Sequence, residues 1–445
     1  MRLDATRFAR HLDAQLPGWR ERRICVALSG GLDSTVLLDL FVQPDCAPVA
    51  LRAVHVDHQL QPESHTWIDA CAATCLARDV PLASLTVAVA RTPGASPEAL
   101  AREARYAALA GALAVNEVLV TGHHADDQAE TVLLQMLRGA GPDGLAAMPA
   151  VRPFGGGIHW RPLLPFDRAA IDDYARERYL EWVEDPTNAA PDFDRNFLRQ
   201  RVMPALQERW PSMSRTLARS AGHSAAAGRL LSEVADLDLT TLARGDRLDL
   251  RGLRALSADR QANALRRWIA VNGRPSPDSR HLGRILTEVL EARRDSRARV
   301  EWHGGGVRRF RDTLHLFVPG EEARPVPRAW GSSEVLDLGA GLGALALEPV
   351  VGDGVAASLI DAGPVDVRWR RGGERIRPGR GCRNRRLKSL FQEAGVLPWM
   401  RDRVPLVYAA GDLVAVGDLW LAGDRIAGPD EPGFAIRWNN RPALR

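Results

Sequence analysis

Between Arg22 and about Gly122, the sequence alternates short apolar runs, rich in β-branched residues, with longer helical runs. Runs typical of strands cover 24–28, 49–56, 84–89 and 117–121, and runs typical of helices cover 34–41, 63–78 and 97–115. This alternation predicts right-handed βαβ units, and therefore a doubly wound parallel sheet with helices on both faces. Ligands of such α/β folds bind at the carboxyl ends of the strands, so we expect a site at that edge.

The first predicted strand leads directly into a glycine loop, Ser29-Gly30-Gly31-Leu32-Asp33-Ser34, and a helix follows at once. Two glycines at such a turn accept backbone angles that a Cβ resists, and they leave space for a ligand. The amides of the turn and the positive end of the helix favour an anion, which we interpret as a phosphate. The glycines alone fit a tight turn equally well, and it is the strand–SGGxDS–helix context that favours a phosphate site. The loop matches neither a Walker motif nor Gly-x-Gly-x-x-Gly.

Two other predicted strands end in histidines. The second ends in His55-Val56-Asp57-His58, and the last ends in Thr121-Gly122-His123-His124. The carboxyl ends of parallel strands meet at one edge of a sheet. We therefore expect His55 and His123 beside the glycine loop.

A helix predicted to begin near Asp126 and to stop at Gly139 carries three carboxylates, those of Asp126, Asp127 and Glu130. Residues three and four apart share a helical face, so these like charges cost stability unless something positive lies between them. An N-cap with acidic residues near the helix dipole explains Asp126 and Asp127, but it does not explain Glu130. A zinc site is disfavoured because His-His-x-Asp-Asp has no recognised zinc spacing. The residues expected on the buried side are Val132, Leu133, Met136 and Leu137.

Arg102 and Arg105 lie three apart in the predicted helix 97–115. A solvated helix face explains them well in so arginine-rich a chain. The functional alternative is a pair of guanidinium groups that face phosphates or carboxylates at the edge of the sheet.

The segment from Arg368 to Lys388 holds ten basic residues against one acid, Glu374. Lys388 is the only lysine among the 59 basic residues of the chain, so a single arginine is less informative here than usual. A solvated charge run would normally carry compensating acids, and we therefore favour a surface for nucleic-acid phosphates. The net charge of +4 and the pI near 9.0 agree with a polyanionic partner.

The length of 445 residues predicts two or three domains. The stretch from Ser212 to Leu290 is typical of helices, and Gly304–Gly306 and Pro319–Pro327 are typical of a linker or a turn-rich boundary. From about Leu336 onward, short runs alternate with Gly and Pro, which predicts a small β-rich domain. The expected boundaries are 1–210, 211–325 and 326–445.

Five cysteines without a framework spacing suit a reducing compartment, and we expect Cys25, Cys46, Cys71 and Cys75 to be buried structural thiols. No run approaches the ~18 apolar residues that cross a bilayer. The N-terminus mixes acids and bases and lacks the core of a signal peptide. These observations predict a soluble cytoplasmic protein without a membrane partner.

Several segments, in this order, resemble the tRNA(Ile)-lysidine synthetase family of the pyrophosphatase-loop ATPases. The matching segments are SGGLDSTVLL (29–38), HVDHQL (55–60), EALAREARY (98–106), TGHHADDQAETVLLQMLRGAG (121–141), WVEDPTN (182–188), DRNFLRQRVMPAL (194–206) and RLKSLFQEAGVLPWMRDRVPLV (386–407). One departure is Asp57, where many relatives carry histidine. The resemblance implies an adenine nucleotide hydrolase-like N-terminal domain, a helical middle domain that contacts tRNA, and a small α+β C-terminal domain that binds tRNA.

The resemblance also implies a two-step reaction on the wobble cytidine of the minor tRNA(Ile) with a CAU anticodon. The cytidine 2-carbonyl oxygen attacks the α-phosphate of ATP, which gives an adenylylated base and pyrophosphate. The ε-amine of free L-lysine then displaces AMP and forms lysidine. ATP is a substrate, Mg²⁺ is expected to accompany it, and a homodimer is left open.

Carried over to this sequence, the resemblance assigns the ATP site to Ser29, Gly30, Gly31, Leu32, Asp33, Ser34, His55 and His123, with Asp33 near Mg²⁺. Catalytic roles fall to Asp33, Arg102, Arg105, Asp126, Asp127 and Glu130, of which the last three also hold lysine. The residues expected to bind tRNA are Arg199, Arg371, Arg380, Arg383, Arg385, Arg386 and Lys388.

Three other functions share part of this pattern. A tRNA cytidine thiolase would use a Cys-x-x-Cys pair or an iron–sulfur cluster, whereas Cys71 and Cys75 are separated by three residues. An amide-forming ligase of the asparagine synthetase type would need a cysteine directly after Met1, where Arg2 stands. A non-catalytic tRNA-binding protein would have no use for an intact glycine loop beside the acidic helix.

Overall fold

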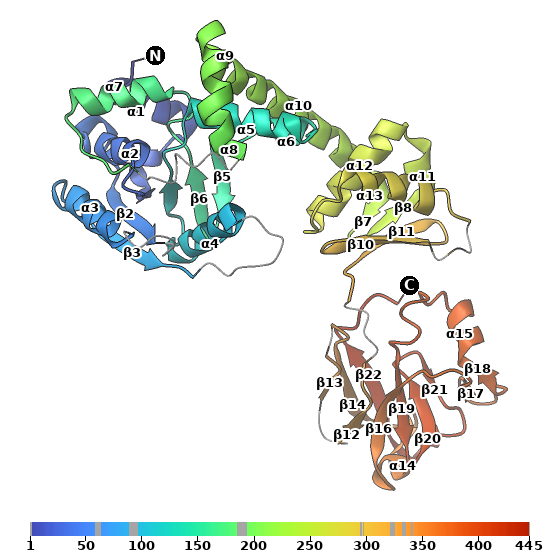
Figure 1. Cartoon of the computed structure of the whole chain (residues 1–445). Helices are drawn as coiled ribbons and strands as arrows, with labels where there is room; N and C mark the ends of the chain where they lie inside the picture. Colours follow the sequence, from blue (N-terminus) through green and yellow to red (C-terminus); the bar gives the residue numbers. More distant parts are fainter. Residues whose placement is uncertain are drawn as a thin grey trace. The chain divides into compact units, whose positions relative to one another are not determined.

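The computed structural model describes residues 2–57, 64–88, 97–184, 194–293, 296, 298–320, 325–331, 335–339 and 341–444 (Figure 1). The chain forms two compact units, Met1–Leu231 and Ser232–Arg445. Parts of the HVDHQL and WVEDPTN segments, and of the predicted 319–327 boundary, lie outside the described residues. Within the described ranges, no helix combines the length and the apolar character that spanning a membrane requires.

The first unit is built on a six-stranded sheet with the order β3-β2-β1-β4-β6-β5. Its strands are β1 (Arg23–Ala27), β2 (Ala50–Asp57), β3 (Leu82–Thr86), β4 (Val118–Val120), β5 (Val151–Phe154) and β6 (Gly157–Trp160). All neighbours are parallel except the edge strand β5, which forms a hairpin with β6. The strand order reverses between β1 and β4, and the crevice at such a switch point is where α/β folds bind ligands.

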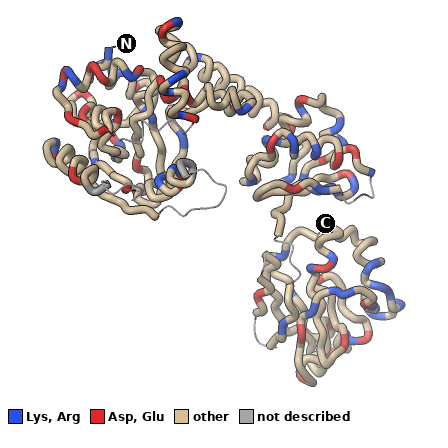
Figure 2. The backbone as a smooth tube through the Cα atoms, viewed as in Figure 1, with Lys and Arg blue, Asp and Glu red and all other residues tan. Residues whose placement is uncertain are grey.

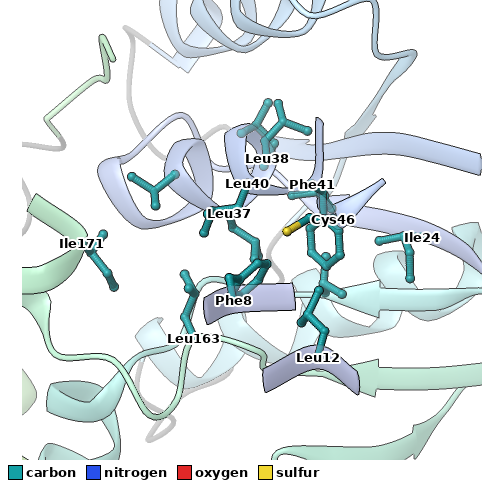
Figure 3. Close-up of a cluster of buried hydrophobic side chains, with 14 of the residues drawn as sticks. Phe8, Leu12, Ile24, Leu37, Leu38, Leu40, Phe41, Cys46, Leu163 and Ile171 are labelled. Atoms are coloured by element: carbon teal, nitrogen blue, oxygen red, sulfur yellow. The ribbon is translucent and has the colours of Figure 1, made fainter. Parts of the chain in front are cut away.

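Alternate residues of the strands face different helix layers, which confirms the doubly wound fold. Ile24 and Val26 belong to a large buried cluster with α1 (Ala5–Gln15), α2 (Leu32–Val42) and α7 (Arg168–Glu177), part of which Figure 3 shows. Cys25, between them, belongs to a second cluster with Leu109 of α4 (Pro97–Ala112). The helix α3 (Ser64–Leu76) contributes Cys71 and Cys75 to the large cluster.

The acidic helix is α5 (Ala125–Leu137), and its buried side differs from the prediction. Val132 is buried, but Met136 and Leu137 are 56% and 77% exposed. The buried positions are taken by polar residues, among them Asp127 and Glu130, because that side of the helix faces the candidate site. The helices that follow in this unit are α6 (Pro142–Leu145), α8 (Asp194–Phe197), the π-helical turn η4 (Leu198–Val202), α9 (Met203–Arg209) and α10 (Met213–Leu242), which continues into the second unit.

The second unit begins with a helical segment, as predicted. Its helices are α11 (Leu250–Ala255), α12 (Ala258–Val271), α13 (Ser279–Arg284) and the π-helical turn η5 (Ile285–Val289). A five-stranded sheet that the sequence analysis did not predict accompanies them, with the order β7-β8-β11-β10-β9. Its strands are β7 (Ala243–Arg244), β8 (Arg247–Asp249), β9 (Arg299–Trp302), β10 (Gly305–Phe310) and β11 (Thr313–Phe317).

The interpretation of Gly304–Gly306 as a linker is wrong. Gly304 turns the chain between β9 and β10 with a φ of +76°, and Gly305 and Gly306 belong to β10. A Cβ on Gly305 would lie 2.6 Å from the Trp302 ring, and one on Gly306 would lie 2.4 Å from the Phe317 ring. These glycines therefore make room for aromatic side chains inside a sheet.

The C-terminal part is rich in short strands, as predicted. Five strands have the order β12-β16-β19-β20-β21, four have the order β13-β14-β22-β15, and β17 pairs with β18. The elements are β12 (Arg328–Trp330), β13 (Leu336–Asp337), β14 (Ala344–Val351), β15 (Val355–Ala356), α14 (Ala357–Asp361), β16 (Val365–Trp369), β17 (Arg375–Ile376), β18 (Arg385–Arg386), α15 (Leu387–Glu393), β19 (Pro405–Ala409), β20 (Asp412–Val416), β21 (Trp420–Leu421) and β22 (Pro432–Asn439). A buried cluster that includes Trp330, Trp369, Phe391 and Trp438 holds this part together.

Candidate active site

The glycine loop connects β1 to α2 at the switch point of the first sheet. Gly30 has a φ of +84°, and Gly31 caps α2 without a side-chain hydrogen bond, so the first N–H groups of the helix are open to an anion. The Ser34 hydroxyl accepts from the Ser29 N–H at 3.1 Å and donates to the Gly31 carbonyl at 3.0 Å. These bonds hold the turn in the shape of a phosphate cradle.

The strand ends converge on this loop, as the topology predicted. A Cβ on Gly122 would lie 2.9 Å from the Asp33 backbone, so only glycine lets the end of β4 approach α2 this closely. The His55 Nδ1 lies 2.9 Å from the Leu28 carbonyl, directly before the loop, and must carry the proton to donate to it. His124 caps α5, and its Nε2 lies 3.7 Å from the Asp33 carboxylate.

Asp33 has a partner that the sequence analysis missed. Both of its carboxylate oxygens accept from Arg168, at the start of α7, at 2.8 Å. Burial raises the pKa of Asp33, while the charges of His124 and Arg168 act in the opposite direction. The guanidinium of Arg168 therefore lies at the mouth of the glycine loop, within reach of any phosphate bound there.

The carboxylates of Asp127 and Glu130 are held by two arginines from the segment after β6 and α7. Arg195 donates to Glu130 at 2.8 Å and to Asp127 at 3.1 Å, and Arg199 bonds the same two side chains at the same distances. These cations supply the positive charge that the spacing of the acids requires. Burial acts to raise the pKa of Asp127, but the nearby His124, His123 and Arg195 outweigh it and keep this pKa below its ordinary range.

Asp126 has a different environment from the other two acids. One of its oxygens accepts from Ser214 at 2.7 Å and from Gln207 at 3.1 Å, and the other accepts from the Arg168 N–H at 2.8 Å. Asp126 thus ties α5 to α7, α9 and α10. Unlike Asp127 and Glu130, it accepts no hydrogen bond from an arginine side chain among the described residues.

Arg102 and Arg105 lie over the ring of Tyr106, at 5.1 and 5.6 Å from its centroid, and Arg152 of β5 lies at 5.8 Å. Three guanidinium groups around one aromatic ring make the surroundings of that ring strongly positive. Arg102 and Arg105 face an aromatic ring rather than acids among the described residues, which suits a role toward phosphates.

The basic segment 368–388 is partly neutralised by acids that lie elsewhere in the sequence. Arg368 pairs with Asp366, Arg370 with Asp402 at 2.8 Å, and Arg385 with Glu393. The side chains of Arg371, Arg383, Arg386 and Lys388 are exposed and have no ion-pair partner among the described residues. Figure 2 shows Lys and Arg positions gathered along the backbone of the β17–β18 hairpin and the start of α15. The exposed Arg380 donates to a backbone carbonyl.

The structure gives some predicted residues other neighbours than those expected. Arg199, predicted to bind tRNA, lies with Arg195 against the acidic helix. Arg195 had a signal in the sequence, because it stands four residues before Arg199 in the DRNFLR segment and shares its helical face. Arg168 had none, because nothing in its neighbourhood indicates that it reaches the glycine loop.

Among the described residues, no three His, Cys, Asp or Glu side chains form a group that could hold a metal ion. One carboxylate, Asp33, stands at the loop. Mg²⁺ in nucleotide sites is commonly bound by one or two carboxylates together with substrate phosphates, so this donor set fits an ion that arrives with ATP.

Family models match three parts of the chain. A PP-loop domain matches residues 4–206, a TilS substrate binding domain matches 248–315, and a TilS substrate C-terminal domain matches 365–438.

The thiols of Cys25, Cys46, Cys71 and Cys75 are buried and free, as expected of structural cysteines.

Curated relatives match over nearly the whole length. The tRNA(Ile)-lysidine synthase of Methylococcus capsulatus is 43% identical over 93% of this chain and 95% of the relative. That of Alkalilimnicola ehrlichii is 43% identical over 98% and 95%, and that of Pseudomonas aeruginosa is 40% identical over 98% of each. Among solved structures, the U34-tRNA thiolase NcsA from Methanococcus maripaludis aligns with a TM-score of 0.41 and 15% identity over 49% of this chain and 77% of that chain, too low a likeness to carry an argument.

Proposed function

Because this chain belongs to the tRNA(Ile)-lysidine synthase family, it is an ATP-dependent enzyme of tRNA modification, and we propose how its site divides the two steps of the reaction. The glycine loop serves the first step, in which the wobble cytidine attacks the α-phosphate and pyrophosphate leaves. The acidic helix serves the second step, in which the ε-amine of lysine replaces AMP. The family relation favours this function over the thiolase.

In the first step, the chain has to position phosphates and neutralise their charge. The amides and hydroxyls of the loop (Ser29 to Ser34) hold the leaving pyrophosphate, with His55 and His123 beside it. Arg102 and Arg105 balance the charge on the α-phosphate. Mg²⁺, held by Asp33 and the phosphates, would supply further neutralisation, and Arg168 is then free to leave Asp33 for a phosphate oxygen.

In the second step, the site has to hold a lysine whose ε-ammonium must lose a proton. The ordinary pKa of that group is about 10.4, so a carboxylate has to bind it and help remove the proton. Asp127 and Glu130 are the acids we assign to this task, and Asp126 orients the helix that carries them. Arg195 and Arg199 balance their charge, and a group of side chains with both signs suits a zwitterionic amino acid, whose carboxylate needs a cation.

One observation supports this division above all. His124 lies between the two halves of the site, with its Nε2 3.7 Å from Asp33 of the loop and 3.5 Å from Asp127 of the acidic helix. A nucleotide on the loop and an amine at the acids would therefore be neighbours, as transfer to an adenylylated base requires.

The two partial reactions test the proposal. Glu130→Gln should leave tRNA-dependent release of pyrophosphate near the wild-type rate and lower the incorporation of labelled lysine about tenfold or more, because an interaction of the second step is lost. Glu177→Gln, which removes an acid paired with Arg2 on the surface, is the control. An equal loss in both partial reactions would contradict the assignment.

The substrate tRNA requires a basic surface as well as the catalytic site. We assign it to Arg371, Arg380, Arg383, Arg386 and Lys388, with Arg385 at its border. The anticodon base would have to be unstacked to reach the glycine loop, which is how proteins commonly read single-stranded RNA loops. We place the reaction in the cytoplasm, where tRNA and reduced thiols are found.

A further inference from the structure

A chain of buried polar side chains ends at the candidate active site. Arg161 and His159 are 2% and 0% exposed, and Thr121 is 7% exposed. The Arg161 guanidinium lies 3.2 Å from the His159 Nδ1, the His159 Nε2 lies 2.9 Å from the Thr121 hydroxyl, and that hydroxyl lies 2.7 Å from the His123 Nδ1. Only His123, at the open end, is half-buried, and it follows Gly122, which contacts Asp33.

The direction of each hydrogen bond follows from the chemistry of the first member. A guanidinium can only donate, so the His159 Nδ1 must accept and the proton of His159 is on its Nε2. The His159 Nε2–H then donates to the Thr121 oxygen. The hydroxyl hydrogen of Thr121 is left to donate to the His123 Nδ1, so the proton of His123 is on its Nε2.

The opposite tautomer of His123 would break this chain. With a proton on Nδ1, His123 would donate to Thr121, and the hydroxyl hydrogen would have no acceptor among the described residues. An unsatisfied donor in a buried place is costly, and a continuous chain of donors and acceptors is favoured. The ring of His159 is also held between Tyr106 and Phe154, with centroids 5.6 Å away in both cases, so it cannot easily turn to another partner.

The two histidines of this hydrogen-bond chain, His159 and His123, stay neutral near pH 7. Burial, with the charge of Arg161, lowers the pKa of His159 to about 2. Burial likewise lowers the pKa of His123 to about 3, against the effect of Asp127. A neutral ring has one N–H, and the position of that proton decides what the ring can do in the site.

We propose that Arg161, His159 and Thr121 are positioning residues that fix His123 as a neutral donor, with its Nε2–H directed to the nucleotide in the first step. The His123 Nε2 has no hydrogen-bond partner among the described residues, so it is free to donate to a phosphate oxygen. This inference rests on the proposed ATP role of His123. The donor holds its direction before ATP arrives, which is what electrostatic preorganisation requires.

Nitrogen NMR of the full chain without nucleotide tests the tautomer directly, because protonated and unprotonated ring nitrogens have distinct chemical shifts. His123→Gln assigns the signal of His123 by its disappearance. The wild type and Thr121→Ser should show His123 protonated at Nε2, whereas the isosteric Thr121→Val should lose this preference. His55, whose Nδ1–H donates to the Leu28 carbonyl, is the internal control and should not change.

The first partial reaction tests the consequence. Thr121→Val should slow tRNA-dependent release of pyrophosphate roughly tenfold, mainly in kcat, while Thr121→Ser stays within about twofold of the wild type. A tautomer or a rate that is the same in Thr121→Val as in the wild type would overturn the proposal. So would an Nδ1 proton on His123 in the wild type, an outcome that does not depend on the folding of the Thr121 variants. Absence of lysine incorporation by the wild type would instead overturn the proposed function.

Discussion

At the scale of single residues, the site is a balance of charges that are close together and shielded from water. Asp127 and Glu130 carry two negative charges, and Arg195 and Arg199 carry two positive ones at 2.8–3.1 Å. Glu130 is nearly inaccessible to solvent. Removing either the acids or the arginines would therefore leave buried charges of one sign without partners, which carries a high desolvation cost. These ion pairs stabilise the fold, and when the substrate binds they have to open or let their charged groups contact the substrate as well.

The lowered pKa of Asp127 predicts how stability depends on pH. The folded state favours the ionised form, so the contribution of Asp127 is complete above its unfolded pKa of about 3.9 and is lost as the pH falls below that value. Asp127→Asn should be roughly 2 kcal/mol less stable than the wild type at pH 7. Urea unfolding should show this gap narrowing below about pH 4. A gap that widens in acid would contradict the sign of the shift.

Arg168 is predicted to bind phosphate, because its guanidinium already lies at the Asp33 carboxylate of the loop. Arg168→Met should raise the KM for ATP about tenfold in the release of pyrophosphate, since a charge-assisted hydrogen bond to the nucleotide is lost. Arg176→Met is the matched control, as Arg176 is on the same helix but pairs with Asp172. Equal KM values in both variants would remove Arg168 from the ATP site.

At the scale of elements, the site depends on a close approach between the end of β4 and the start of α2. Period-two burial along the strands puts helices on both faces of the sheet, and the strand order reverses between β1 and β4, where α/β folds bind ligands. The residues that permit the approach are small. Gly122 has no room for a side chain beside Asp33, and Gly30 meets the Cys71 thiol.

Gly122→Ala should therefore displace α2 from β4 and abolish most ATP-dependent release of pyrophosphate, because its Cβ would lie 2.9 Å from backbone atoms of Asp33. Gly111→Ala, in α4 and with nothing within 4 Å of the added Cβ, is the control. It should keep activity and gain up to about 1 kcal/mol from the better helix propensity of alanine. Thermal unfolding beside the activity assay separates a lost fold from a lost site.

At the scale of the whole molecule, catalysis and tRNA binding draw on different parts of the chain. The first unit carries the loop and the acidic helix, and the second carries the exposed arginines and the lysine of the β17–β18 hairpin and α15. Each of these charges would release counterions on binding a phosphate, so their effect is measured by the dependence of tRNA affinity on salt.

We expect a smaller salt dependence when Gln replaces Arg383, Arg386 and Lys388 together. The slope of log K for tRNA binding against the logarithm of the salt concentration should fall by about 2–3. A triple control with the same change of charge, Arg368→Gln, Arg425→Gln and Arg437→Gln, removes arginines that are already paired with acids and should change the slope by less than about 1. Cys382, the exposed member of the five cysteines, provides a second readout, since bound tRNA should protect it from alkylation. An unchanged slope together with an unprotected thiol would move the tRNA surface elsewhere.

Local patterns were enough to predict the α/β fold, the glycine loop and the convergence of the strand ends, because alternation, turn chemistry and the rule for parallel sheets act over short stretches of chain. They were not enough for the sheet of the middle segment, where glycines make room for Trp302 and Phe317 instead of ending the structure. Nor did they predict the exposed Met136 and Leu137, because a helix beside a polar site buries its acids.

The residue pattern was enough to assign the three acids and the glycine loop to the carboxyl edge of the sheet. The folded structure selects the cations that meet them: Arg168 lies 135 residues from Asp33, and Arg195 lies 65 residues from Glu130. It also decided the hydrogen-bond chain behind His123, whose members come from two strand ends. Charges and hydrogen bonds act through space, and folding alone brings such distant side chains within reach of one another.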